Sequence, residues 1–225
     1  MALSEARREA RRQRLIAFAQ ALIRENAGAG FSMAQLAQRA GVSPATPYNL
    51  IGPKSEVLRL VVRAEFDGFV HRLDDLDGKA GLVRLRTAAE RVSTHYLADR
   101  AFYLGLYRAS SGVEGAELYG LMQSEGRSLW SSLIAAACES GELGPLARAQ
   151  TFTDTLLRTI SAVTQAWLTE SWCGPRFTLE LRHACDLLFC AVAAPRSSAF
   201  LAAELERTQA ELQALAPPGP DVAAA

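Results

Sequence analysis

The sequence predicts an all-α protein with a small N-terminal helix-turn-helix domain followed by a larger helical domain. Apolar residues recur at three- and four-residue spacing through most of the chain. No stretch alternates apolar and polar residues over a length that would indicate a strand. Glycine- and proline-bearing breaks separate the helical patterns. We therefore expect a helix-turn-helix domain at 1–56, a helical domain at 57–215 and a disordered tail at 216–225.

The first helix is expected over 4–26, where Leu15, Phe18 and Leu22 fall on one apolar stripe and Gly28 and Gly30 mark the end. Its first half is rich in arginine, at positions Arg7, Arg8, Arg11, Arg12 and Arg14. Two interpretations stay open. These side chains could reach a phosphate backbone or a minor groove, or they could simply be solvated at a frayed helix end.

The stretch 31–59 carries the turn between two short helices. Ser32 and Gln35 have the spacing of a capping box, and Phe31 and Leu36 that of a hydrophobic staple. Gly41 follows where a helix ends in a left-handed residue, and we expect Val42 to return to the core.

A second, short helix should follow this turn, with Ser43 as its cap and Pro44 at its first position. Two helices joined by so short a turn form a helix-turn-helix, whose second helix can enter the major groove of DNA. An αα-corner of an ordinary helical protein uses the same residues, so spacing alone does not decide. The residues we predict to contact DNA are Ser32, Ser43, Pro44, Ala45, Thr46, Tyr48, Asn49 and Lys54.

The remaining chain predicts seven further helices. A helix opening at Gly52-Pro53 should run to about residue 73 and link the two domains. The others are expected at 80–98, 100–110, 114–140, 145–171, 177–194 and 197–214.

Composition and charge narrow the class of protein. The chain has 225 residues, 49% of them hydrophobic, which suffices for a sizeable core. Residues 1–60 hold nine Lys/Arg and four Asp/Glu, whereas the remainder holds fifteen and twenty. A basic first quarter on an acidic body fits nucleic-acid contact at one end, although chance clustering gives the same count. No apolar run spans a membrane and no secretory signal is evident, so we expect a cytoplasmic protein without membrane contact.

The run Gly41-Val42-Ser43, with Thr46, Tyr48, Gly52, Lys54 and Val57-Leu58, resembles the DNA-binding domain of the tetracycline-repressor (TetR) family of transcriptional regulators. The resemblance covers roughly residues 10–62. It implies a homodimer on a palindromic double-stranded DNA operator, and a small hydrophobic effector in a larger ligand-binding and dimerisation domain.

Two positions depart from the pattern of this family. Pro47 stands inside the recognition helix, where it forfeits an N–H bond and pushes Thr46 from helical angles, so the first turn should be distorted or 3₁₀-like. Leu50 stands where the pattern has a polar or aromatic residue, which removes a polar contact.

The last two long helices are predicted to form the dimer interface. Residues 184–194 are apolar nearly all round except for Asp186, so this helix must be buried on every side. One face can pack on its own core and the other on a second copy. A fully internal helix in a monomer is the alternative.

Aromatic residues gather in the middle of the larger domain, and they predict an apolar pocket with a few polar groups. An ordinary core with tyrosine hydroxyls at its edge is the alternative. The candidate ligand-binding residues are Phe66, His95, Tyr103, Tyr107, Trp130 and Trp167.

We expect no catalytic residues, no cofactor and no metal. The sequence has no Ser/His/Asp grouping, no phosphate-cradling glycine loop and no metal-ligand spacing. The four cysteines, Cys138, Cys173, Cys185 and Cys190, form no CxxC pair, and we interpret them as reduced. The favoured function is a ligand-responsive transcriptional regulator, acting as a repressor. The alternatives are a helical protein-interaction adaptor and a helical enzyme that retains a helix-turn-helix.

Overall fold

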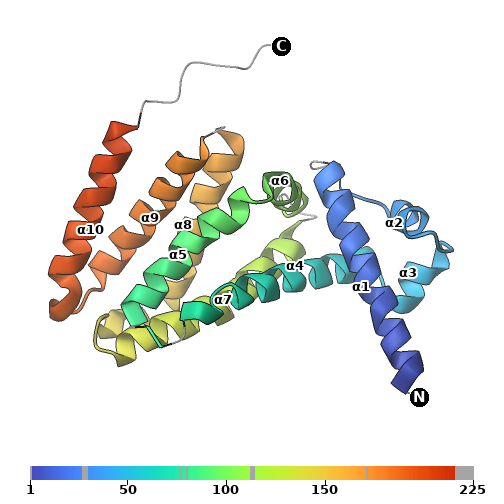
Figure 1. Ribbon diagram of the computed structural model, residues 1–225, viewed down its shortest axis with the longest axis horizontal. Helices are drawn as coiled ribbons and strands as arrows, with labels where there is room; N and C mark the ends of the chain where they lie inside the picture. The colour runs from blue at the N-terminus through green and yellow to red at the C-terminus, as the bar shows by residue number, and fades with distance from the viewer. Residues whose placement is uncertain are drawn as a thin grey trace, which may run out of the picture. The chain divides into compact units, whose positions relative to one another are not determined.

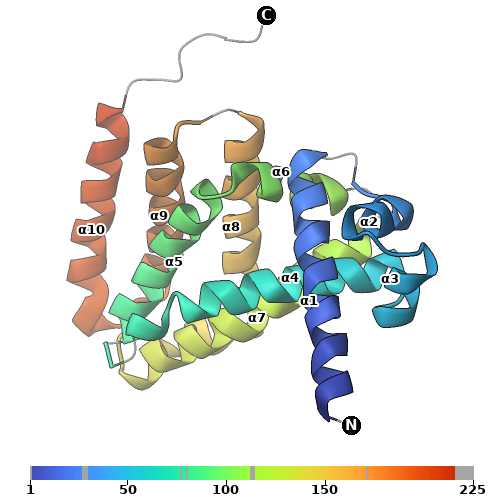
Figure 2. The same cartoon turned by 45° about the vertical axis from the view of Figure 1, so that its right-hand side comes forward.

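The computed structural model describes residues 2–26, 30–76, 78–79, 81–111, 115–170 and 172–215. Within these ranges every named element is a helix, apart from one isolated bridge between Leu143 and Ala193. Figures 1 and 2 show the helices from two sides. The all-α class is confirmed. The expected breaks at Gly28 and Gly112 and the tail at 216–225 lie outside the described residues.

The helices follow the predicted order, with ends that shift by a few residues. They are α1 (Ala2–Glu25), α2 (Met33–Ala40), α3 (Ala45–Leu50), α4 (Lys54–His71), α5 (Gly81–Leu97), α6 (Arg100–Ala109), α7 (Ala116–Glu139), α8 (Gln150–Thr169), α9 (Gly174–Ala191) and α10 (Pro195–Ala214). Two 3₁₀ turns, η1 (Asp74–Leu76) and η2 (Pro145–Arg148), lie between them.

One predicted helix is wrong in its boundaries. The sequence pattern predicts a single helix over 145–171, but the structure has η2, an extended residue at Ala149 (φ −66°, ψ 134°) and then α8. Pro145 and Gly144 precede the 3₁₀ turn, and the extended backbone at Ala149 interrupts the hydrogen-bond ladder. The helix therefore begins five residues later than its apolar pattern.

The chain forms two compact units, and each is described by itself. Unit 1 comprises Met1–Arg72 and Asp99–Gly126, and unit 2 comprises Leu73–Ala98 and Arg127–Ala225. Helix α4 continues without a break across the boundary that the sequence suggested at residue 56, and α7 contributes to both units. The division into 1–56 and 57–215 stays a prediction.

Unit 1 is built around α1, which contacts α2, α3, α4 and α6. Of the expected stripe, Leu15 and Leu22 are buried and Phe18 is half-buried, while Ala19 and Ile23 beside them are at most 2% exposed. Helix α6 approaches α1 closely at Gly105, where an added Cβ would lie 2.6 Å from the carbonyl oxygen of Ile23. This approach requires glycine for steric reasons, because no side chain fits between the two backbones.

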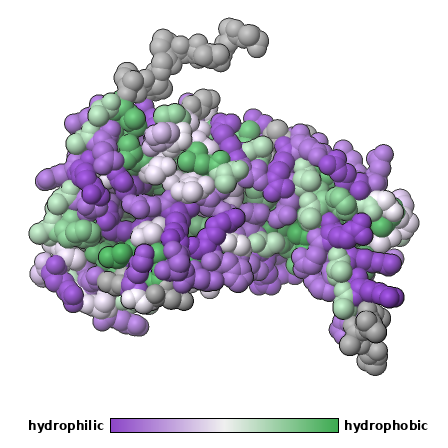
Figure 3. Space-filling model, in the orientation of Figure 1, coloured by the Kyte–Doolittle hydropathy of each residue, from purple (hydrophilic) through white to green (hydrophobic). Residues whose placement is uncertain are grey.

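Unit 2 places α9 against α5, α8 and α10. Its core includes Trp167 of α8, whose ring stacks on Phe177 of α9 with centroids 4.3 Å apart. On the face shown in Figure 3, hydrophilic side chains predominate and apolar ones form small separate patches. Two of the larger exposed apolar side chains belong to this unit, Leu187 on α9 and Phe200 on α10.

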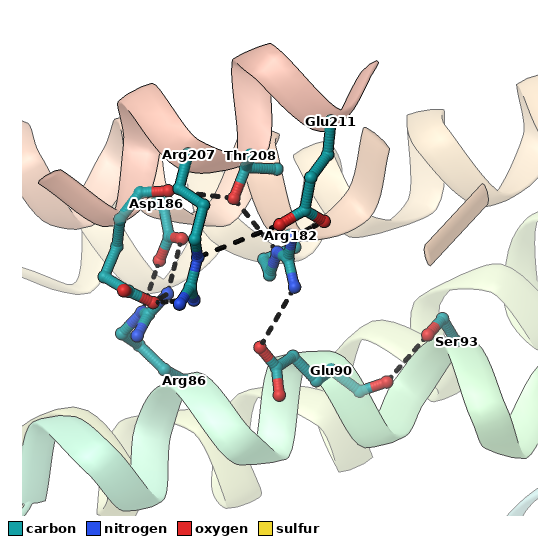
Figure 4. A network of polar contacts seen from close by, with 9 residues as sticks. Arg86, Glu90, Ser93, Arg182, Asp186, Arg207, Thr208 and Glu211 are labelled. Atoms are coloured by element: carbon teal, nitrogen blue, oxygen red, sulfur yellow. Dashed lines mark hydrogen bonds and ion pairs between the residues drawn. The ribbon is translucent and has the colours of Figure 1, made fainter. Parts of the chain in front are cut away.

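A buried ion-pair cluster joins α5, α9 and α10, and Figure 4 shows it at close range. Arg86 donates two hydrogen bonds to Asp186, with Nε–Oδ1 2.7 Å and Nη2–Oδ2 2.9 Å, and its Nη2 lies 2.8 Å from Glu204 Oε2. Burial opposes the charged form of Arg86, but Asp186 and Glu204 outweigh it and raise the Arg86 pKa above its ordinary value. The one acidic residue in the apolar run 184–194 therefore has a buried partner.

A second arginine, Arg182, extends this cluster along α9. It donates to Thr208 Oγ1 at 3.0 Å and to Glu211 Oε2 at 2.6 Å, and its Nη1 lies 4.0 Å from Glu90 (Figure 4). The helix pair α9–α10 is thus held by charge-assisted hydrogen bonds as well as by apolar burial, and these fix the register of α10.

Replacing Gly105 by alanine is expected to lower the free energy of unfolding by about 1–3 kcal/mol, because α6 must move away from α1. Gly120 is the matched control. An alanine there meets nothing within 4 Å and should raise helix stability by about 0.5–1 kcal/mol. Urea denaturation measures both. Equal effects of the two substitutions would contradict the close approach.

The substitution Asp186→Ala should cost about 3 kcal/mol of folding free energy, because it leaves the buried Arg86 without its bidentate partner. Asp75→Ala breaks the Asp75–Arg91 pair, in which the Asp75 side chain is 64% exposed, and should hardly move the denaturation midpoint. If Asp186→Ala lowers the free energy of unfolding no more than Asp75→Ala does, water screens the Arg86–Asp186 pair.

Candidate nucleic-acid interface

The turn between α2 and α3 has the geometry that the sequence predicts. Ser32 Oγ accepts the N–H of Gln35 at 3.1 Å, and Gln35 Oε1 accepts the N–H of Ser32 at 2.7 Å, which completes the capping box. Gly41 adopts φ 66°, and the N–H groups of Gly41 and Val42 return to the carbonyls of Gln38 and Ala37. This Schellman arrangement ends α2 sharply.

Three predictions about this turn and the start of α3 are wrong. Val42 does not return to the core but is 38% exposed. Ser43 does not cap α3, because Pro44 occupies the cap position and no side chain caps the helix. Instead Ser43 Oγ lies 2.9 Å from Thr46 Oγ1, and the carbonyl of Ser43 accepts the N–H of Thr46 at 2.9 Å. That i−3 bond is of the 3₁₀ type, but Thr46 lies within the α-helix α3, so the expectation that Pro47 pushes Thr46 from helical angles is wrong.

Helix α3 presents a polar face to solvent. Ala45, Tyr48 and Asn49 are exposed, with Tyr48 at 54%, and Thr46 is half-buried. Pro47 is buried, and its carbonyl accepts the N–H groups of Ile51 and Gly52. The proline therefore packs inward, and the helix keeps its exposed side chains for contact with a partner.

The predicted contact residues that flank α3 are also exposed. Lys54 is the first residue of α4, and its ammonium lies 5.4 Å from the centroid of the Phe31 ring. That position leaves the charge at the surface while the buried aromatic ring stabilises it. Ser32 and Pro44 are exposed as well.

A groove of about 550 Å³ runs between α1 and the α2–α3 turn. Arg11 and Arg14 of α1 line it on one side, and Ser43 and Thr46 line it on the other. Both arginines are exposed, and neither has a hydrogen bond or ion pair with any residue that the structure describes. The groove therefore combines two unpaired cations with two hydroxyl groups, which is the chemistry that binds phosphate oxygens.

Sequence reasoning noted the arginines of the first helix but did not separate Arg11 and Arg14 from the others. A signal was present, because Arg11, Arg14 and Phe18 have the i, i+3, i+7 spacing of one helix face. Only the packing of α1 against α3 shows that this face borders the turn.

Three of the predicted ligand-binding residues lie in unit 1, where Phe66 and Tyr107 are half-buried and Tyr103 is buried. The Tyr103 hydroxyl donates to Glu65 Oε2 at 3.0 Å, and Gln20 donates to Glu65 Oε1 at 3.0 Å. Burial raises the pKa of Glu65 above its ordinary value, and the hydrogen bond from Tyr103 offsets part of that increase.

The other three predicted ligand-binding residues lie in unit 2. Trp130 and Trp167 are at most 3% exposed, and His95 is half-buried. Trp167 packs on Phe177, as described above, so its ring has a core partner. These six residues stay predicted ligand contacts.

Across the described ranges, no group of three or more His, Cys, Asp or Glu side chains could hold a metal ion. The four cysteines carry free thiols, and burial raises the pKa of the Cys185 thiol above its ordinary value. No described helix is long and apolar enough to span a bilayer.

Comparison with solved structures identifies the fold as that of TetR-family transcriptional regulators. A TetR transcriptional regulator from a Rhodococcus species aligns with a TM-score of 0.61 at 22% identity, over 80% of this chain and 96% of that chain. RolR, solved in complex with the ligand resorcinol, aligns with a TM-score of 0.67 at 16% identity, over 90% of this chain and 96% of that chain. The repressor QsdR of R. erythropolis, from the TetR family, aligns with a TM-score of 0.55 at 21% identity, over 80% of this chain and 93% of that chain.

No protein-family profile and no curated protein sequence matches this chain. The likeness is therefore one of structure. It agrees with the resemblance that the turn residues 41–58 carry in the sequence.

The raised pKa of Glu65 predicts a pH effect on stability. Because the folded carboxyl holds its proton above the ordinary value of 4.5, the stability contribution of Glu65 is greatest below that pH and falls as pH rises through the folded pKa. We expect the free energy of unfolding, relative to that of Glu65→Gln, to decrease from pH 4 to pH 8, as measured by urea denaturation. Tyr103→Phe should steepen the decrease. A pH-independent difference would contradict the burial of this carboxyl.

Proposed function

We propose that the protein is a ligand-responsive, DNA-binding transcriptional regulator of the TetR family that binds a palindromic operator as a homodimer and acts as a repressor. The observation that carries the proposal is the exposed face of α3 beside the Arg11–Arg14 groove, within a fold shared with TetR-family regulators. The excess of Lys and Arg in residues 1–60 also supports DNA contact by this part of the chain.

In this proposal α3 enters the major groove of the duplex. Tyr48 and Asn49 are the exposed side chains that can reach base edges, and the Asn49 amide can pair with adenine N6 and N7. Ala45 offers a small apolar contact for a thymine methyl group. Specificity then depends on these side chains, since Leu50 offers no hydrogen bond.

Phosphate contacts come from the groove and from its flanks. Arg11 and Arg14 can bind one backbone phosphate together with the Ser43 and Thr46 hydroxyls, which already lie within hydrogen-bond distance of each other. Lys54 can bind a second phosphate from the start of α4. Such contacts fix the register of the protein on the duplex but carry no sequence information.

Dimerisation is proposed to use α9 and α10. Leu187 and Phe200 expose 48% and 46% of their surface in the single chain, which supports a further partner for this pair of helices. A two-fold dimer would present two α3 helices to half-sites about 34 Å apart, one helical turn of DNA.

The effector is proposed to be a small hydrophobic or aromatic molecule, with contacts drawn from the six candidate residues from Phe66 to Trp167. RolR, of similar fold, is solved with resorcinol, which supports an aromatic effector. The effector can release the operator only as far as it binds the released form more tightly than the DNA-bound form.

The proposal is tested by selecting bound duplexes from a random pool with the full chain. We expect enrichment of a palindrome and an affinity that falls steeply with salt, because binding releases counterions. Sedimentation of the pure protein should give a dimer. A monomer that enriches no duplex at low ionic strength would overturn the proposal.

Two substitutions in the interface should separate base contact from phosphate contact. Asn49→Ala should weaken binding to the selected operator by about 1–3 kcal/mol and relax the preference at one position, because it removes a base contact. Arg14→Gln should weaken binding to all duplexes alike and reduce the slope of log affinity against log salt by about 1. Fluorescence anisotropy over a salt series measures both effects.

The control is Lys79→Gln, which removes an exposed positive charge from unit 2 and should leave affinity and slope unchanged. If Arg14→Gln behaves like Lys79→Gln, the groove does not bind phosphate. If Asn49→Ala leaves the selected sequence unchanged, α3 does not read that position.

A further inference from the structure

A second groove lies in unit 2, and none of the residues that line it is proposed above to contact DNA or effector. It has a volume of about 340 Å³, which lies in the range of small-molecule sites. Helix α7 contributes Arg127, Ser131 and the apolar residues Ile134 and Ala135. The η2 turn contributes Ala147 and Arg148, and α8 contributes Gln150 and Thr153.

Two arginines give this groove its charge. Arg148 is exposed and has no hydrogen bond or ion pair with any described residue. Arg127 donates from Nε to Asp154 Oδ1 at 2.7 Å, and its two Nη groups have no acceptor within the part of the chain that the structure describes. Asp154 balances one positive charge, so the groove keeps a net positive charge from Arg148.

The first turn of α8 borders the same groove. Its cap residue is Ala149, which has no side chain that could accept an N–H, and no acidic residue lies in the first turn. The free N–H groups of a helix start carry a partial positive charge and favour an anion. Nothing described in the protein supplies that anion here.

Thr153 is the observation that points to a bound ligand. It is 3% exposed and lines the groove, yet its hydroxyl has no hydrogen-bond partner among the described residues. The buried side-chain oxygens without a partner in the described chain include Thr164 Oγ1 but not Thr153 Oγ1, so the Thr153 hydroxyl is open to the groove, where it can donate to a ligand oxygen. A ligand oxygen held by Arg148 at this helix start would satisfy Thr153 as well.

From this arrangement we infer that the groove between α7, η2 and α8 binds a small organic anion with a carboxylate or phosphate head and a short apolar body. The head is bound by Arg148, the free Nη groups of Arg127 and the Thr153 hydroxyl. The apolar body lies against Ile134, Ala135 and Ala147. The inference does not depend on DNA binding, since all its residues lie in unit 2.

Titration calorimetry on the full chain tests the site with phenyl phosphate, benzoate and inorganic phosphate as probes. We expect phenyl phosphate or benzoate to bind at millimolar concentration, and the probe with a ring to bind more tightly than inorganic phosphate because it also contacts the apolar wall. No heat of binding from either aromatic probe at such concentrations would overturn the inference. If inorganic phosphate binds as tightly as the aromatic probes, the proposed contact of the ligand with the apolar wall is wrong.

Two variants locate the binding. Arg148→Gln should weaken the aromatic probe about tenfold, as expected for loss of a charge-assisted hydrogen bond. Thr153→Val keeps the shape of the side chain and should weaken the probe several-fold. Without probe, the same variant should keep the stability of the parent, because the hydroxyl it removes has no hydrogen bond to a described residue.

The matched control is Arg158→Gln, which removes an exposed arginine of α8 that does not line the groove. It should bind the probes as the parent does. An equal loss from Arg158→Gln and Arg148→Gln would indicate diffuse charge attraction and overturn the site. Unchanged binding by Thr153→Val, with its fold intact by circular dichroism, would exclude the hydroxyl contact.

Discussion

Burial of one apolar stripe along α1 is the constraint on which unit 1 depends. The stripe of Leu15, Ala19 and Ile23 meets α2, α3, α4 and α6, so a single helix supports every other helix of this unit. Gly105 allows the close approach of α6 to α1. The same helix carries Arg11 and Arg14 at its other edge, where they border the α2–α3 turn. Packing and surface charge are therefore coupled, because a shift of α1 moves the two cations relative to α3.

Charge plays a different part in unit 2. The Arg86–Asp186–Glu204 cluster is buried, and its pairing is bidentate on one side. Replacing a buried ion pair by apolar residues often leaves the free energy of unfolding unchanged, whereas removing one partner lowers it. Such a cluster therefore acts chiefly by selecting one packing arrangement of the helices. Here it fixes the register of α10 on α9 and α5. The exposed apolar residues Leu187 and Phe200 then keep a defined position on the surface of this unit.

The interface residues show how far local rules extend. The capping box at Ser32 and the left-handed Gly41 depend only on neighbours within six residues, and both are as predicted. The effect of Pro47 is smaller than predicted, because Thr46 stays within α3 and only its N–H makes a 3₁₀-type bond, to the carbonyl of Ser43. Ser43 and Val42 were assigned wrongly, because the hydroxyl of Ser43 has a second partner in Thr46 and Val42 lies beside an open groove. Competition between partners of similar strength cannot be resolved from spacing alone.

By itself, the sequence determined the all-α class, the order of the helices, the helix-turn-helix and the basic first quarter of the chain. These follow from periodicity, caps and charge, which act between residues close in the chain. Only the tertiary structure decided that Arg11 and Arg14 share a groove with Ser43 and Thr46, and that Asp186 pairs with Arg86 a hundred residues away. It also placed the unpartnered Thr153 beside Arg148. Such contacts depend on how helices pack, and the helical period of a sequence gives the buried face of each helix but not its partner.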